Sequence, residues 1–282
     1  MRRAMTERDD SGGLTEGERW ARAELQALLA RRFSPPAVGR FLWRSQQRTN
    51  EIRRRHPALG RQAWTWMAIG AAAWGGLAAG GAQPFRRRVR AGLTWWALTT
   101  LMLDWHLGMI ESEDGAPVLL GPADALTLLR VWLVPVAADT PSAGVVALAG
   151  LTDVLDGRAA RATRTTRLGR DLEGLADACF AAAALSGSVR RERVSRVAVS
   201  AELARLGLGF AYALLTYFGR VQAPDARLTR AARLTTPVRV SGIVAGSLGL
   251  RRLADGLIAG GCAWSVAIVL RALRRGAPSR SG

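Results

Sequence analysis

Residues 64–82 read WTWMAIGAAAWGGLAAGGA, a run of apolar and small residues without a charged side chain. With its flanks, this run reaches the ~20 residues that an α-helix needs to cross the hydrocarbon core of a bilayer. Residues 91–110 form a second hydrophobic stretch of similar length, with tryptophans near its ends, where aromatic belts lie at membrane surfaces. The sequence therefore predicts membrane-spanning helices, and no alternating strand pattern competes with them.

Further hydrophobic segments continue this pattern toward the C-terminus. They lie at about 123–138, 142–157, 172–189, 196–218, 235–250 and 253–271. Many are rich in Ala and Gly, which in membranes permit close contact between helices. We therefore predict an all-α fold, a polytopic integral membrane helical bundle with a six-helix core over residues 120–275. Two extra hydrophobic helices at 63–112 precede this core, and a basic tail at 276–282 follows it.

The first 62 residues differ from the rest of the chain, because they are polar and rich in Arg. An amphipathic helix is predicted over Thr15–Arg32, and Ser34-Pro35-Pro36 ends it. We interpret residues 1–62 as a basic cytoplasmic extension that lies on anionic lipid, and the start of the chain has no secretory signal pattern. Because every chemistry-bearing motif lies downstream, we expect catalysis to be independent of this extension.

The charge balance at first suggests a nucleic-acid-binding protein. The chain has 40 basic and 22 acidic side chains, which leaves a formal net charge of +18. Yet 49% of the residues are hydrophobic, and the positive charge is spread over several loops instead of one patch, so nucleic acid is not an expected partner. The two cysteines lie in apolar stretches and form neither a disulfide framework nor a cysteine zinc site.

The distribution of Arg between the hydrophobic segments predicts the orientation of the chain. If the loop between segments 142–157 and 172–189 faces the cytoplasm, several Arg-rich loops lie inside, as the positive-inside rule requires. Arg86-Arg87-Arg88 and Arg190-Arg191 then face outward, which conflicts with that rule. On balance we expect a protein of a bacterial cell membrane with this loop on the cytoplasmic side.

The strongest charge cluster reads LTDVLDGRAAR at 151–161, followed by GRDLEGLAD at 169–177. On helices, positions 153, 156, 157, 160 and 161 share one face, and positions 169, 173 and 177 share another. Four carboxylates can therefore converge, those of Asp153, Asp156, Glu173 and Asp177. Such a cluster needs cations, and its hard oxygen ligands suit Mg²⁺ or Mn²⁺. The alternative is a cytosolic loop of ordinary salt bridges, which the regular spacing over two helix faces disfavours.

This segment resembles the signature of the CDP-alcohol phosphotransferases, also called CDP-alcohol phosphatidyltransferases. The matching pattern is Asp153-x2-Asp156-Gly157-x2-Ala160-Arg161-x7-Gly169-x3-Glu173-x3-Asp177. Upstream, Asp124, Thr127, Arg130 and Pro135 are similar to the family's first-helix pattern, in which Asn is common at the first of these positions. Glu173 is a departure, because the family has Asp there. The resemblance covers about residues 120–275.

The resemblance implies transfer of a phosphatidyl, or related phospho-, group from a CDP-linked donor to an alcohol, with release of CMP. It implies two divalent ions, held by Asp153, Asp156, Glu173 and Asp177, and it makes Asp177 the general base as well. It also implies a site for the CDP group lined by Gly157, Ala160, Arg161 and Gly169. The expected partners are a CDP-linked lipid donor, a small alcohol or lipid acceptor and membrane lipids, and a homodimer is one option.

Other polar residues of the hydrophobic segments are less specific. Arg130 and Arg239 are candidates for contact with an acceptor or lipid phosphate, although Arg239 can equally extend toward water near a helix end. Glu202 and Arg205 lie one helical turn apart and are expected to pair. Two alternative functions stay open: a catalytically degenerate family member that acts as a membrane binding or scaffold subunit, and a transporter that uses intramembrane carboxylates.

Overall fold

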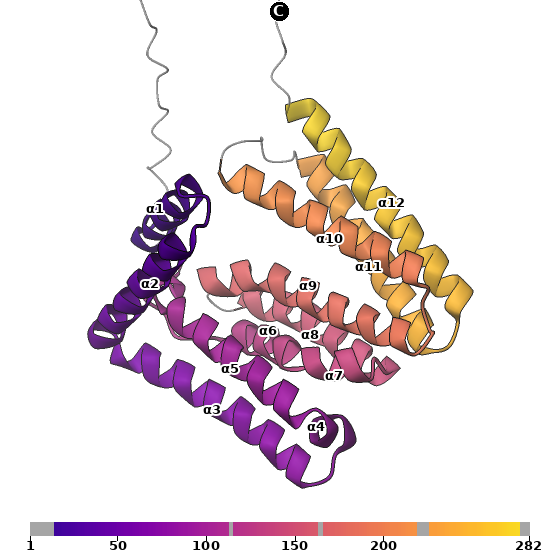
Figure 1. Ribbon diagram of the computed structural model, residues 1–282, viewed down its shortest axis with the longest axis horizontal. Helices are drawn as coiled ribbons and strands as arrows, with labels where there is room; N and C mark the ends of the chain where they lie inside the picture. Colours follow the sequence, from indigo (N-terminus) through magenta and orange to yellow (C-terminus); the bar gives the residue numbers. More distant parts are fainter. Residues whose placement is uncertain (1–13, 113–114, 163–165, 219–225, 277–282) are drawn as a thin grey trace, which may run out of the picture. The chain divides into compact units, whose positions relative to one another are not determined.

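The computed structural model describes the chain apart from residues 1–13, 113–114, 163–165, 219–225 and 277–282. Within helices, it also leaves out the side chains of residues 153–154, 156–162, 170–171 and 275–276. The described backbone is helical, and its β-pairing is limited to an isolated bridge between Glu111 and Pro117 (Figure 1). The expected all-α fold is confirmed.

The N-terminal extension begins with two helices, α1 (Glu16–Ala30) and α2 (Pro35–Arg55). Thr15 and Glu18 form a reciprocal capping box at the start of α1, which satisfies two backbone N–H groups that have no partner within the helix. The first helix ends at Ala30, before Ser34-Pro35-Pro36, and Pro35 begins the second helix. A proline is tolerated there because the first turn of a helix needs no N–H donor.

Each predicted hydrophobic segment falls on helical structure. The helices are α3 (Pro57–Ala79), α4 (Gln83–Arg87), α5 (Val89–Trp105), α6 (Pro122–Trp132), α7 (Val134–Asp139), α8 (Ala143–Ala162), α9 (Arg167–Arg190), α10 (Arg196–Tyr217), α11 (Ala226–Ser247) and α12 (Arg251–Gly276), with a short 3₁₀ helix η2 (Leu107–Met109). The segment predicted at 123–138 differs, because it is divided into α6 and α7. Pro135, in the first turn of α7, cannot donate a hydrogen bond to the preceding turn, so one continuous helix is interrupted.

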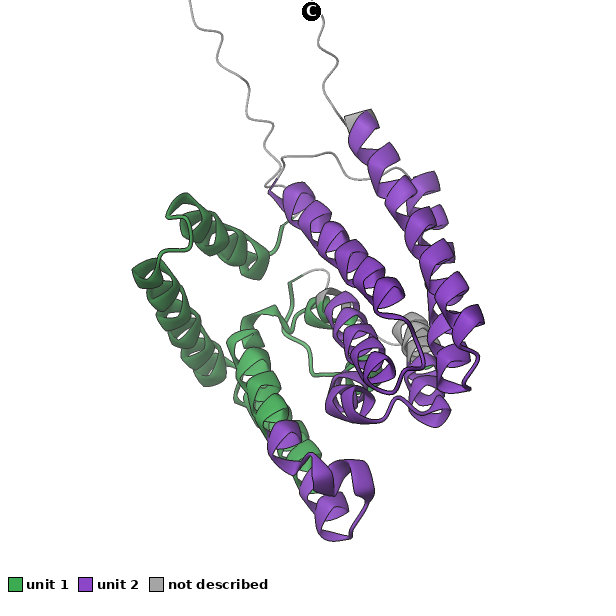
Figure 2. Cartoon of the chain, turned by 45° about the vertical axis from the view of Figure 1, so that its right-hand side comes forward, with its two compact units in different colours: residues 1–73, 94–127, 155–173 green, residues 74–93, 128–154, 174–282 purple. Residues whose placement is uncertain are grey.

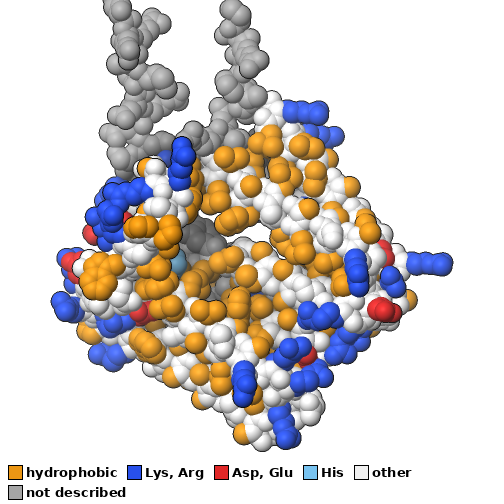
Figure 3. Space-filling view, in the orientation of Figure 1, with side chains coloured by type: hydrophobic (Ala, Val, Ile, Leu, Met, Phe, Trp, Pro, Cys, Tyr) orange, Lys and Arg blue, Asp and Glu red, His pale blue; other side chains and the backbone are white. Residues whose placement is uncertain are grey.

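Among the described residues, three helices are long and apolar enough to cross a membrane: α9, α10 and α12. Large apolar side chains of α10 lie on the surface, for example Val197 at 80% exposure and Phe210 at 63%. Figure 3 shows hydrophobic side chains spread over α10 and α12, with arginines gathered near helix ends. These surfaces are suited to contact with lipid. The larger number of spans, with a six-helix core and two extra helices, stays a prediction.

The chain divides into two compact units that alternate along the sequence (Figure 2). Unit 1 comprises residues 1–73, 94–127 and 155–173, and unit 2 comprises residues 74–93, 128–154 and 174–282. These limits do not follow the domain boundaries predicted from the sequence, which remain predictions. Within unit 1, the indole nitrogen of Trp96 donates to the carbonyl oxygen of Met67 at 2.7 Å and so joins α5 to α3.

Unit 2 contains a tight helix pair and a buried ionic anchor. Gly242 of α11 packs so closely on α12 that a Cβ atom there would lie 2.7 Å from Ile258 Cγ1.

Asp139, at the end of α7, accepts hydrogen bonds from Arg87 and from Arg88 Nε, the latter at 2.8 Å. Burial acts to raise the pKa of Asp139, but the hydrogen bonds from Arg87, Arg88 and Thr140 outweigh it and lower this pKa to about 2. Two of the three consecutive arginines that conflict with the positive-inside rule are therefore paired with the same carboxylate, which offsets one of their two charges.

Candidate active site

Arg130 of α6 is buried and contacts residues of α8 and α9 that lie with it in unit 2. Its side chain is only 2% exposed. Its Nη1 atom donates to Oδ1 of Asp177 on α9, and its Nε atom lies 3.5 Å from Oγ1 of Thr152 on α8. Thr152 directly precedes Asp153 in the sequence. One guanidinium group therefore contacts both the predicted general base and Thr152, the residue before the predicted metal ligand Asp153.

Two predicted metal ligands lie on the accessible side of α9. The Asp177 side chain is 45% exposed, and Glu173, one helical turn earlier, is also exposed. No group of three or more His, Cys, Asp or Glu side chains suited to a metal ion occurs among the described residues. Asp153 and Asp156 lie on α8, but their side chains are outside the described set. The convergence of all four carboxylates therefore stays a prediction.

The residues predicted to line the CDP site fall on both helices of the motif. Gly157, Ala160 and Arg161 belong to α8, and their side-chain positions are outside the described residues. Gly169 lies in the first turn of α9, where a Cβ atom would come within 2.2 Å of Asp124 Oδ1. The close approach of this carboxylate therefore gives Gly169 a packing role in addition to the predicted contact with CDP.

Asp124 and Thr166 fix the start of α9 within unit 1. The Thr166 hydroxyl donates to Asp124 Oδ1 at 2.6 Å and accepts the backbone N–H of Gly169 at 2.8 Å. The other oxygen of Asp124 accepts the backbone N–H of Gly121 at 2.7 Å. The sequence indicates Asp124 only as the counterpart of the family's Asn, and Thr166 is not among the predicted site residues. The sequence feature that could have indicated Thr166 is its place directly before the helix that carries Glu173, where threonine is a common N-terminal cap.

The sequence that contains these residues matches a known protein family. The profile of the CDP-alcohol phosphatidyltransferase family matches residues 121–270, more than half of the 282 residues. The chain belongs to the CDP-alcohol phosphatidyltransferase family. The match contains Arg130 and the whole segment from Asp153 to Asp177, so the resemblance inferred from the motif is confirmed. A search of curated proteins and a search of solved structures give no match.

Family membership determines the general chemistry. CDP-alcohol phosphatidyltransferases transfer a phosphatidyl group from a CDP-alcohol to an alcohol, so this chain is assigned to a family of transferases. Members are typically membrane-bound, which agrees with the three apolar helices, and they generally depend on divalent metal ions.

A second buried ionic cluster lies within the family segment, between α10, α11 and α12. The predicted pair is confirmed, because Arg205 binds Glu202 through Nη2 at 2.7 Å and Nε at 2.9 Å. Arg239 also donates to Glu202, and its other terminal nitrogen lies 3.1 Å from Thr236 Oγ1. The Cys262 thiol is 2.9 Å from Glu202 Oε2. Arg239 is thus part of an internal ion pair, and its contact with an acceptor or lipid phosphate stays a prediction.

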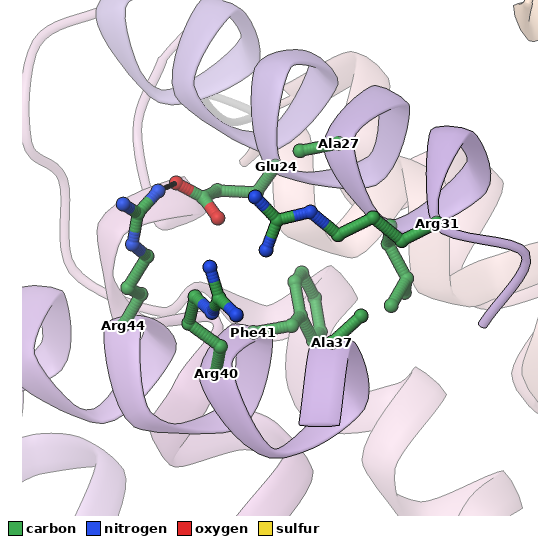
Figure 4. A pocket seen from close by; sticks show the side chains of 8 residues that line it. Glu24, Ala27, Arg31, Ala37, Arg40, Phe41 and Arg44 are labelled. Atoms are coloured by element: carbon green, nitrogen blue, oxygen red, sulfur yellow. Dashed lines mark hydrogen bonds and ion pairs between the residues drawn. The ribbon is translucent and has the colours of Figure 1, made fainter. Parts of the chain in front are cut away.

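A pocket outside the family segment lies between α1 and α2 (Figure 4). Guanidinium groups of Arg31, Arg40 and Arg44 surround it, and Arg44 Nη1 lies 2.7 Å from the carboxylate of Glu24. Leu28 is among its apolar lining residues. None of the predicted site residues lines this pocket, so it is distinct from the motif on α8 and α9. The contact of the extension with anionic lipid stays a prediction.

Proposed function

We propose that the protein transfers a phosphatidyl, or related phospho-, group from a CDP-linked donor such as CDP-diacylglycerol to an alcohol in phospholipid biosynthesis. The contact between Arg130 and Asp177 carries this proposal beyond family membership, because a buried guanidinium orients a half-exposed carboxylate of the family motif. In the reaction, the alcohol oxygen forms a bond to the phosphatidyl phosphorus. The bond from that phosphorus to the bridging oxygen breaks, and CMP leaves with that oxygen.

The proposed metal ligands are Asp153, Asp156, Glu173 and Asp177, which would hold two Mg²⁺ or Mn²⁺ ions. The two described members of this set fit such a role, because both are carboxylates that solvent reaches on one face of α9. When bound, the ions would stabilise negative charge on the attacking and leaving oxygens of the phosphoryl transfer.

The remaining roles belong to side chains of the motif. Asp177 accepts the proton of the alcohol as the oxygen attacks, which requires hydrogen-bond reach between the two groups. Arg130 keeps the Asp177 carboxylate in one orientation through its buried contact. Gly157, Ala160 and Gly169 leave room for the donor near the backbone, and the Arg161 guanidinium offers paired donors to phosphate oxygens.

We place this reaction at the cytoplasmic face of a bacterial cell membrane. There the acyl chains of donor and product stay in lipid while the CDP group reaches water. A catalytically degenerate member that serves as a scaffold is the second candidate, and the departure from Asp at Glu173 is the observation that favours it. A transporter is less favoured, because the family match covers the whole acidic motif.

The direct test is an assay of CMP release by the purified protein in detergent or lipid. The protein is incubated with CDP-diacylglycerol and Mg²⁺ together with glycerol 3-phosphate, an inositol phosphate, a phosphatidyl lipid or another polyol. We expect CMP release that requires one acceptor class, which then identifies the acceptor. Failure of every acceptor to support CMP release, with CDP-diacylglycerol and with other CDP-linked donors, would contradict the proposal.

Glu173 separates an adapted enzyme from a degenerate one. Its carboxylate lies one methylene further from the backbone than that of Asp, and a misplacement of about 1 Å can cost on the order of a hundredfold in rate. We expect the site to be adapted to Glu, so that Glu173→Asp and Glu173→Gln both lower CMP release, by up to about a hundredfold. The matched control is Glu51→Asp, because Glu51 is an exposed residue of α2, and this substitution should leave the rate unchanged.

The two substitutions at Glu173 have different diagnostic outcomes. A strong increase in rate for Glu173→Asp would identify the natural protein as a degraded enzyme. An unchanged rate for Glu173→Gln would remove Glu173 from the metal site.

A further inference from the structure

The first turn of α1 contacts Gly108, Glu111 and Gly115 within unit 1. The Thr15 hydroxyl donates to Oε1 of Glu111, and it also accepts the backbone N–H of Glu18 in the capping box. Gly17 permits the close approach, because a Cβ atom there would lie 2.8 Å from the carbonyl oxygen of Gly108 and 3.0 Å from Glu111 Oε1. The first turn of α1 is therefore joined to another segment of unit 1 by a specific contact.

The same contact includes Arg167, the first residue of α9. Its side chain is 7% exposed and forms an ion pair with Glu18 of α1. Its Nε atom donates to the carbonyl oxygen of Ser112 at 3.3 Å and lies 3.9 Å from Glu111 Oε1. Its backbone N–H donates to the Glu111 carbonyl oxygen at 2.9 Å. Both the backbone and the side chain at the start of α9 are thus held by these partners.

We infer that α1 acts as a clamp that positions the start of α9 for catalysis, with Arg167 and Glu18 as its positioning residues. Arg167 lies two residues before Gly169 and six before Glu173, on the part of α9 that belongs to unit 1. A shift of Arg167 moves this first turn and the carboxylate beyond it, and small displacements of ligating groups have large effects on rate. This inference rests on the proposed function, and it replaces the expectation that catalysis is independent of residues 1–62.

Buried charge makes this clamp sensitive to the loss of either partner. Arg167 is almost fully enclosed, so its guanidinium depends on the carboxylates of Glu18 and Glu111 in place of water. Removing the charge of Glu18 takes away the ion pair that joins this arginine to α1. The arginine and the turn it begins then lose their fixed position relative to α1.

The substitution Glu18→Gln isolates the ionic contact from the formation of α1. Gln at this position of a capping box still accepts the Thr15 N–H, so the helix start is kept. The matched control is Glu16→Gln in the same turn, because Glu16 is 75% exposed and lies 3.7 Å from Arg48. A second test variant is Gly17→Ala, which forces α1 away from Gly108. Its control is Gly39→Ala on α2, where a Cβ atom meets nothing within 4 Å.

Two readouts test the clamp on the full-length protein. The first is hydrogen–deuterium exchange of residues 166–173 without added metal, which should accelerate in Glu18→Gln and Gly17→Ala and stay unchanged in both controls. The second is the Mg²⁺ dependence of CMP release. The Mg²⁺ concentration for half-maximal rate should rise by about tenfold in both clamp variants, more than the maximal rate falls, because loss of a residue that orients a metal ligand lowers metal affinity by this order.

If Glu18 and Gly17 only stabilise the fold, the two readouts give a different result. Such a role would lower the maximal rate through a smaller folded fraction, with an unchanged Mg²⁺ dependence and unchanged exchange at 166–173, and this result would overturn the inference. Unchanged values of both readouts in Glu18→Gln and Gly17→Ala would overturn it as well. If the unmodified protein releases no CMP, the proposed function fails, whereas the exchange measurement still decides whether α1 holds the start of α9.

Discussion

Asp177→Asn is expected to lower the rate of CMP release from CDP-diacylglycerol by about 10³-fold, within the range of general acid–base catalysis. The amide cannot take the proton of the alcohol, and it is a poorer ligand for a divalent cation than a carboxylate. Its oxygen still accepts a hydrogen bond from Arg130, so the junction between α6, α8 and α9 is kept. The rate is measured at saturating donor, acceptor and Mg²⁺.

Asn is the appropriate substitution here because Ala would confuse catalysis with stability. Removing the side chain of Asp177 leaves Arg130 buried without this carboxylate, and an uncompensated buried charge costs about 3 kcal/mol of stability. Glu51→Gln, an exposed carboxylate paired with Arg55, serves as the control and should retain the full rate. A rate for Asp177→Asn within about threefold of the unmodified protein, far from the range expected of a lost base, excludes Asp177 as the base.

Asp153→Asn and Asp156→Asn are each expected to reduce CMP release by at least about 10²-fold, as loss of one group that stabilises transition-state charge does. Both positions lie on α8 near Thr152, which contacts the guanidinium that also orients Asp177. Because both residues are proposed as ligands in a polar cavity, the purified variants should keep the melting temperature and helix content of the unmodified protein. Unmodified rates in either variant would show that the metal assignment on α8 is wrong.

Local periodicity explains how much of this molecule was predictable from the sequence. The hydrophobic segments predicted helices because the bilayer length and the helix repeat are both properties of short stretches. The spacing from Asp153 to Asp177 identified the family for the same reason. The pair of Glu202 with Arg205 was also predictable, because the two residues are one turn apart on one helix.

Contacts between distant segments explain what the sequence did not predict. Arg130 meets Asp177 across 47 positions of the chain, and no local pattern indicates which carboxylate a buried arginine will meet. Arg239 likewise meets Glu202 across 37 positions of the chain, from another helix. The basic character of the extension is evident in the sequence, whereas the ion pair between Glu18 and Arg167 depends on the fold.

Divalent-metal dependence is the measurement that tests the four-carboxylate site most directly. The purified protein is treated with excess EDTA, exchanged into metal-free buffer and assayed for CMP release from CDP-diacylglycerol while Mg²⁺ is titrated back. We expect no turnover in the chelated protein and full recovery with Mg²⁺, because Asp153, Asp156, Glu173 and Asp177 repel one another and cannot bind a pyrophosphate donor without cations. Full turnover in excess chelator would contradict the metal site on α8 and α9.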